Sequence, residues 1–350
     1  MSKSKPKSTS SPHRRRTTLI VWALLLGSIA SIAAWYLWHS FQQFADRPLH
    51  DRPDPVVILV PQGSGLHGIL DQLATAGLDP DPRWRWQLLL RQSGLAGKLK
   101  SGEYAIPRRL TPRGLLVAIA EGKVVQHRVT IFEGTRFKDL RLLLAQQPAL
   151  TQTLTGLSDE EVLKRIGSTR THAEGWFLPE TYFYPRGFTD LDLLKRAYWE
   201  MEKALAAAWE GRAKDLPLDD PYQALILASI VEKETGKASE RPTIAGVFIR
   251  RMKLGMRLQT DPTVIYGLGD AFDGNLRRRD LLSDTPYNTY TRAGLPPTPI
   301  ALPGRKALEA AVHPDNGKSL YFVSRGDGSH AFSETLQQHN SAVAKFQLGR

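Results

Sequence analysis

Two glutamates near the end of an apolar segment are the residues of this sequence best suited to proton transfer. Residues 224–235 are mainly apolar up to Glu232 and Glu234, and Gly236 follows them. This pattern predicts a helix that ends at a glycine cap. Positions two residues apart lie about 200° apart around a helix. The two carboxylates therefore cannot act as a facing pair from this helix.

Glu234 is the better candidate for a general acid. It continues the bulkiest apolar stripe of the helix, which consists of Leu227, Ile230 and Val231. Burial on such a face disfavours the charged form of a carboxyl group and raises its pKa. A proton donor that works near neutral pH needs this property. The alternative is that both Glu232 and Glu234 are solvated residues at a frayed helix end.

Two later segments carry polar and aromatic side chains at high density. Residues 256–267 and 285–297 are rich in amide, hydroxyl and ring groups. Neutral hydrogen-bonding groups beside aromatic rings favour a polyol or an amino sugar as substrate over a phosphate. Residues 174–184 (EGWFLPETYFY) hold five aromatic rings. They are equally consistent with core packing and with the wall of a sugar-binding groove.

Several other chemistries lack the residues that they need. The chain has no cysteine, which excludes thiolate zinc sites, iron–sulfur clusters and a cysteine nucleophile. It also lacks the H-E-x-x-H pattern of zinc hydrolases and the G-x-S-x-G elbow of serine hydrolases. Residues 63–68 match G-x-G-x-x-G, but no repeated strand–helix–strand pattern follows to build a dinucleotide-binding sheet. A tight turn between a strand and a helix explains these glycines better.

The N-terminal region has the pattern of a membrane anchor. Residues 17–38 contain no charged residue, and 22 helical residues span about 33 Å, enough to cross the hydrocarbon core. The basic residues before this segment predict a cytoplasmic N-terminus. A cleaved signal peptide is the alternative, but its apolar core is usually shorter. The net charge is +12, and six of these positive charges lie in the first 18 residues. This distribution argues against a nucleic-acid-binding role for the globular part.

The rest of the chain alternates between short strands and helices and predicts an α+β fold. A compact β-α-α-β unit is expected within residues 56–127, from a β-branched strand at 56–60 to a strand at 102–107. The remaining elements are expected as a strand at 124–132, helices within 135–170 and at 191–209, 222–235 and 239–255, and a strand at 320–323. We assign no function to the short C-terminal segment after His339.

Three motifs in this order resemble the endolytic murein transglycosylases, also called the YceG-like family. They are residues 228–235 (ASIVEKET), residues 257–267 (RLQTDPTVIYG), and residues 287–290 (YNTY) with 294–297 (GLPP). The resemblance covers about residues 56–348. It implies an α+β protein with an N-terminal transmembrane helix, a small LysM-like β-α-α-β module and a larger α+β catalytic domain. The implied regions are a cytoplasmic basic tail (1–16), the transmembrane helix (17–39), a linker (40–55), the LysM-like module (56–127), a connecting region (128–170) and the catalytic domain (171–350).

The resemblance also implies an activity and its residues. The expected enzyme is a peptidoglycan lyase that cuts nascent glycan strands internally at the bond between N-acetylmuramic acid and N-acetylglucosamine, and so terminates their elongation. The catalytic glutamate of the family corresponds to Glu234, with Glu232 as the second possibility. The expected substrate-binding residues are Gln259, Thr260, Asp261, Tyr266, Tyr287, Asn288 and Tyr290.

A lytic transglycosylase needs one acid, because the C6 hydroxyl of the sugar itself attacks C1 and leaves a 1,6-anhydro end. No cofactor and no metal are expected. The expected partners are peptidoglycan strands, the inner membrane and cell-wall synthases (penicillin-binding proteins), with no nucleic acid. The expected location is the bacterial inner membrane, with a single span and a periplasmic catalytic domain. Two alternatives remain open: a non-catalytic peptidoglycan-binding tether and a hydrolytic muramidase.

Overall fold

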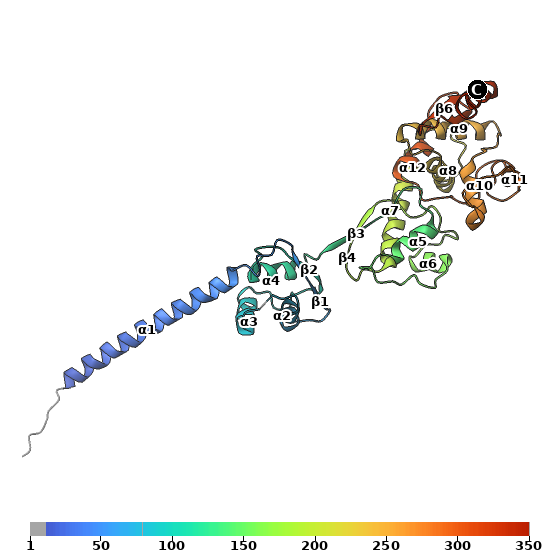
Figure 1. Ribbon diagram of the computed structural model, residues 1–350. Helices are drawn as coiled ribbons and strands as arrows, with labels where there is room; N and C mark the ends of the chain where they lie inside the picture. Colours follow the sequence, from blue (N-terminus) through green and yellow to red (C-terminus); the bar gives the residue numbers. More distant parts are fainter. Residues whose placement is uncertain (1–11, 79, 350) are drawn as a thin grey trace, which may run out of the picture. The chain divides into compact units, whose positions relative to one another are not determined.

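The computed structural model describes residues 12–78 and 80–349, which divide into two compact units (Figure 1). The units are Met1–Val125 and Gln126–Arg350. Helices and short two-stranded antiparallel sheets make up both units, so the predicted α+β class is confirmed. Most of the basic tail predicted at 1–16 lies outside the described residues.

The first helix of the first unit has two parts with opposite surroundings. Helix α1 (Pro12–Asp46) is long and apolar enough to cross a membrane. Its apolar side chains between Leu19 and Trp38 are exposed, whereas Phe41 and Phe44 are buried in the core of the unit. The ring of Phe44 packs edge-on against Trp86 at 5.5 Å. The helix thus continues beyond residue 40, where the sequence indicated a linker.

The remainder of the first unit has the predicted β-α-α-β order. Its elements are β1 (Val56–Val60), α2 (Leu66–Thr75), α3 (Arg83–Gln92), β2 (Gly102–Ile106) and α4 (Pro112–Glu121). Strands β1 and β2 pair antiparallel, with Ile58 opposite Tyr104. Gly63 has φ +78° and lies in the turn before α2. The glycine-rich loop therefore precedes a helix without the parallel sheet of a dinucleotide-binding fold.

The second unit begins with a strand pair whose two strands are separated in the sequence by two short helices. Its first elements are β3 (Gln126–Thr130), α5 (Phe137–Ala145), α6 (Asp159–Arg165), β4 (Thr181–Pro185) and α7 (Asp190–Glu210). Strand β3 pairs antiparallel with β4. Of the five rings in residues 174–184, all except Phe183 are buried in the main core. Core packing, and not a sugar-binding wall, explains this aromatic segment.

Helix α8 (Pro221–Glu234) is the centre of the second unit. It contacts α7, α9 (Arg241–Lys253) and α12 (Arg305–Val312), and every side chain from Ala224 to Glu232 is buried. Asp220 caps its N-terminus by accepting a hydrogen bond from the backbone of Gln223. The predicted glycine cap is wrong, because the helix ends at Thr235 in extended conformation. The Thr235 hydroxyl accepts the Lys237 N–H and so turns the chain.

The last elements lie around the C-terminal end of α8. They are η1 (Ala238–Glu240), α10 (Asp261–Leu268), η2 (Gly269–Ala271), α11 (Arg278–Leu282), β5 (Tyr321–Ser324), β6 (His330–Ser333) and α13 (Leu336–Phe346). Strands β5 and β6 form an antiparallel hairpin, and α13 packs against it. Thr335 caps α13 through a capping box with Gln338. Of these elements, α10, β5, β6 and α13 line a cavity beside Glu234.

Candidate active site

The carboxyl of Glu234 lies at the end of α8, at the edge of a cavity of about 520 Å³. Residues 258–261, the β5–β6 hairpin and α13 supply most of the other walls. The side chains that line the cavity include those of Arg251, Gln259, Thr260, Asp261, Tyr290, Tyr321, His330 and His339. Glu234 is half-buried. One acidic group is therefore held between protein atoms and an open polar cavity.

The surroundings of Glu234 keep its proton available near neutral pH. Burial raises the pKa of this carboxyl to about 7, and the negative charge of Asp261 adds to the rise. The Thr260 hydroxyl donates a hydrogen bond to Glu234, which opposes the rise. Since a carboxyl with this pKa is protonated in about half of the molecules at pH 7, Glu234 has the property of a general acid.

Two sequence motifs meet at this carboxyl. The Thr289 hydroxyl accepts a hydrogen bond from the Thr260 backbone N–H at 3.0 Å. The Tyr290 hydroxyl donates to Asp261 at 2.6 Å. Residues 257–267 and 287–290 are therefore held together beside Glu234, so four of the expected binding residues share its cavity: Gln259, Thr260, Asp261 and Tyr290.

Gln259 has an unusual backbone conformation. Its φ of +54° lies in the left-handed region, which non-glycine residues adopt rarely. Its N–H donates to the Thr289 carbonyl at 3.1 Å, and its side-chain oxygen accepts from Arg251 at 3.3 Å. These bonds hold a strained residue directly before Thr260, and such strain is concentrated at functional sites.

Glu232 lies in entirely different surroundings from Glu234. Its carboxylate accepts from the Arg241 guanidinium at 2.7 Å and from the Gly304 N–H at 2.9 Å. The side chains of Glu232 and Arg241 are 3% and 8% exposed. Burial raises the pKa of Glu232, whereas Gly304 and Arg241 lower it. This carboxyl belongs to a buried ion pair, which Arg241 extends to Glu133 at 3.0 Å.

Tyr266 and Tyr287 line a second cavity, of about 380 Å³. The Tyr266 hydroxyl contacts Glu174 at 3.3 Å, and the Tyr287 hydroxyl is 2.8 Å from that of Thr298. The two rings meet edge to face at 4.9 Å. Tyr266 belongs to α10, whose first residue, Asp261, lines the cavity of Glu234. Six of the seven expected binding residues therefore line two cavities at the two ends of one short helix.

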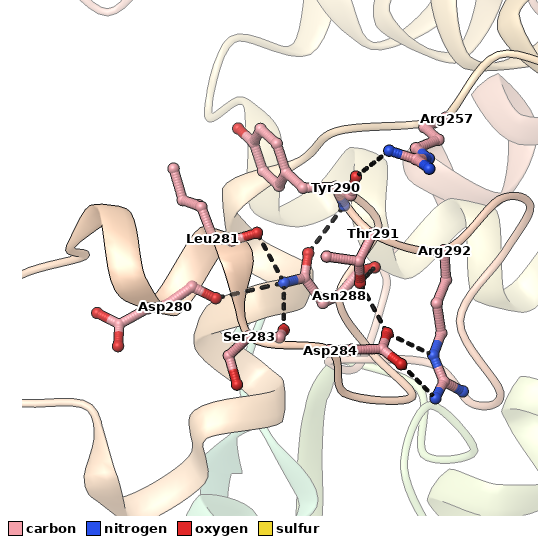
Figure 2. A network of polar contacts seen from close by, with 9 residues as sticks. All are labelled: Arg257, Asp280, Leu281, Ser283, Asp284, Asn288, Tyr290, Thr291 and Arg292. Atoms are coloured by element: carbon pink, nitrogen blue, oxygen red, sulfur yellow. Dashed lines mark hydrogen bonds and ion pairs between the residues drawn. The ribbon is translucent and has the colours of Figure 1, made fainter.

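Asn288 lines neither of these two cavities. It is fully buried, and its amide nitrogen donates to three backbone carbonyls, those of Asp280, Leu281 and Ser283, at 2.7–3.3 Å (Figure 2). Its oxygen accepts the Tyr290 N–H at 2.8 Å. Nearby, Asp284 and Arg292 form an ion pair at 2.9 Å. Asn288 thus fixes the loop that carries Tyr290.

Sequence reasoning missed several residues at these cavities. Glu174 is the first residue of the aromatic segment. The pattern of rings gave no indication that its carboxyl lies at a cavity. Arg251, Tyr321 and His339 come from three separate elements, and no local motif connects them.

Comparison with known proteins gives consistent matches over most of the chain. A sequence model of the YceG-like family matches residues 58–345. The chain is 29% identical to an endolytic murein transglycosylase of Bacillus subtilis, over 85% of this chain and 86% of that protein. It is 26% identical to an endolytic murein transglycosylase of Streptococcus pneumoniae, over 71% of this chain and half of that protein. The crystal structure of a YceG-like protein from Listeria monocytogenes matches with a TM-score of 0.54 and 27% identity, over 83% of this chain and all of that one.

Proposed function

Because the chain belongs to the YceG-like family, we propose that it is an endolytic murein transglycosylase whose general acid is Glu234. The names of the relatives in Bacillus and Streptococcus support the activity. One observation supports the acid: the Glu234 carboxyl, with a pKa of about 7, lies at the edge of an open cavity. Glu232 is the weaker candidate, since Arg241 and Gly304 already occupy its oxygens.

The proposed reaction uses one carboxyl group twice. Protonated Glu234 gives its proton to the oxygen between N-acetylmuramic acid and N-acetylglucosamine, and the bond from C1 to that oxygen breaks. The resulting carboxylate then accepts the proton of the C6 hydroxyl of the muramic acid, and the C6 oxygen bonds to C1. The products are a 1,6-anhydro end and a free 4-hydroxyl group. The nucleophile is intramolecular, so it has a high effective concentration without an activated water.

The binding residues divide into three proposed roles. Gln259, Asp261 and Tyr290 line the cavity of Glu234, and we assign to them hydrogen bonds with hydroxyl or acetamido groups beside the cleaved bond. Tyr266 and Tyr287 act at a greater distance, by holding α10. Asn288 positions the loop of Tyr290 and does not contact the substrate.

The remaining expectations concern the location and the first unit. We propose that α1 crosses the inner membrane once, with its N-terminus in the cytoplasm and the chain after about residue 40 in the periplasm. The exposure of its apolar side chains between Leu19 and Trp38 supports a membrane as their surroundings. The antiparallel β-α-α-β arrangement supports a LysM-like module that binds glycan. Penicillin-binding synthases are the proposed protein partners.

The test is mass spectrometry of the soluble products released from peptidoglycan by the detergent-solubilised protein. Wild type should release anhydro-muropeptides, and Glu234→Gln should reduce their rate of release by about 10²–10⁴-fold. Reducing ends would instead indicate a hydrolase, with Asp261 as the second carboxylate to examine. If Glu234→Gln still releases the products, Glu232 would be assigned as the general acid instead. No products from wild type, with glycan still bound, would favour a tether.

A further inference from the structure

His339 is a titratable residue at the cavity of Glu234 that the proposed reaction does not use. It lies on α13, while Glu234 lies on α8. Both residues line the same cavity. Thr335 and Gln338 cap α13 immediately before His339, and His339 donates its backbone N–H to the Thr335 carbonyl at 3.0 Å. The imidazole is therefore placed at the cavity by regular secondary structure.

A stack of side chains holds the ring of His339 in one orientation. The ring lies on Tyr321 with 5.2 Å between centroids and 23° between planes. The guanidinium of Arg251 lies 5.0 Å from the Tyr321 ring centre. Arg251 is buried and is fixed by hydrogen bonds to the carbonyls of Leu320 and Leu258, at 2.7 and 2.9 Å. Stacking on Tyr321, and not hydrogen bonding by the imidazole, therefore fixes the position of the ring.

The nitrogens of His339 remain unused. Within residues 12–78 and 80–349, its side chain has no hydrogen-bond partner, and Nδ1 is buried from solvent. The other histidine of the cavity, His330, already pairs with Glu240 at 2.8 Å. A charged His339 would place a proton on Nδ1, where no acceptor lies. Burial and the charge of Arg251 accordingly lower the pKa of His339. A lowered pKa favours the neutral ring at pH 7, and because Nδ1 has no acceptor among the described residues we place the ring proton on Nε2.

We propose that His339 is a substrate-binding residue whose Nε2–H donates a hydrogen bond to a hydroxyl or acetamido oxygen of an amino sugar in the Glu234 cavity. The proposal rests on the proposed function for the identity of the ligand. A neutral donor suits the neutral oxygens of a sugar. Arg251, a cation that also lines the cavity, donates through Nε and Nη1 to the carbonyls of Leu320, Arg257 and Leu258. The C-terminal helix α13 thereby takes part in substrate recognition.

Three substitutions separate the hydrogen bond from the shape of the ring. His339→Phe keeps a ring that can stack on Tyr321 but has no donor, and it should raise KM for peptidoglycan about five- to tenfold with little change in kcat. His339→Gln should stay within about threefold of wild type, because its amide nitrogen reaches the place of Nε2. His313→Phe, at an exposed histidine outside this cavity, should have no effect.

Binding experiments then separate this proposal from the catalytic one. Glu234→Gln is compared with Glu234→Gln/His339→Phe for binding to purified, undigested glycan strands, and the double variant should bind about five- to tenfold more weakly. Equal affinities would overturn the role of His339 even if wild type releases anhydro products. Wild type without products would overturn the proposed function, whereas the binding comparison would still decide about His339.

A loss of stability in His339→Phe, seen as a lower Tm, would call for a second pair of variants. His339→Gln and His339→Asn carry the same amide, but the shorter asparagine cannot reach the place of Nε2. A weaker affinity for Asn than for Gln supports the proposal. Equal affinities of these two variants, or a failure of Glu234→Gln to bind glycan at all, would overturn it.

Discussion

The cavities at the two ends of α10 each contain a carboxyl group whose pKa is about 7, yet the two groups are suited to different tasks. Burial is the main cause of the raised pKa in both Glu234 and Glu174. Glu174 accepts the Phe137 N–H at 3.0 Å and contacts the Tyr266 hydroxyl at 3.3 Å. Among the residues that the structure describes, Glu234 receives one side-chain hydrogen bond, from the hydroxyl of Thr260.

A raised pKa therefore does not by itself identify a catalytic acid. Glu174 is 8% exposed and lies at the N-terminus of α5, where a negative charge is favourable. Its partners connect α5 to α10, so we infer that it stabilises the fold between the two cavities. Glu234 is more exposed than Glu174 and has fewer hydrogen-bond partners, which leaves its proton available to a substrate.

The largest expected effect is the difference between two equivalent substitutions. Glu234→Gln should reduce the release of anhydro products by about 10²–10⁴-fold, whereas Glu174→Gln should retain activity within a few-fold once it is folded. Gln at position 174 still offers an oxygen to the Phe137 N–H. Initial rates by mass spectrometry, with Tm as the control for folding, make the comparison. Equal losses of activity in two folded variants would contradict the division of tasks.

Glu232, a third buried carboxyl, should differ from Glu234 in how strongly its substitution lowers the stability of the fold. Glu232→Gln removes one partner of a buried ion pair and should lower the free energy of unfolding by about 3 kcal/mol. Glu234→Gln should change it far less. Urea unfolding followed by circular dichroism measures both. A stable but inactive Glu232→Gln would instead indicate that Glu232 is the acid.

Two neighbours of Glu234 should shift its pKa in opposite directions. The Thr260 hydrogen bond lowers this pKa and the charge of Asp261 raises it. Activity requires protonated Glu234 and should therefore fall as pH rises through about 7. Thr260→Val should move this alkaline limb to higher pH, and Asp261→Asn should move it to lower pH. Profiles of kcat/KM against pH test both shifts, and identical limbs in the three proteins would exclude Glu234 as the titrating acid.

The smallest expected effect concerns the second cavity. Tyr266→Phe removes the hydroxyl that contacts Glu174 and should cost about 1 kcal/mol of stability. The alkaline limb of the activity profile should not move, because Tyr266 does not line the cavity of Glu234. Thermal unfolding and the same pH profile provide the two measurements. A shifted limb would show that the two cavities are coupled through α10.

Local patterns in the sequence predicted most of the elements, because each depends on residues near one another. The β-branched strand at 56–60, the β-α-α-β order and the helix carrying Glu234 follow from periodicity. The end of that helix was harder to predict. Thr235 adopts an extended conformation, and its hydroxyl accepts the Lys237 N–H. The helix therefore ends without a glycine cap.

The family motifs, the apolar N-terminal helix and the preference for Glu234 over Glu232 as the candidate acid could all be derived from the sequence. This preference was possible because helical geometry places the two glutamates on different faces. The partners of each group, in contrast, depend on the tertiary structure. Arg241 and Gly304 reach Glu232, Thr260 reaches Glu234, and α13 carries His339 to the same cavity. These contacts join residues from separate elements of the chain, and hydrogen bonding and burial depend on distances in space that no local spacing records.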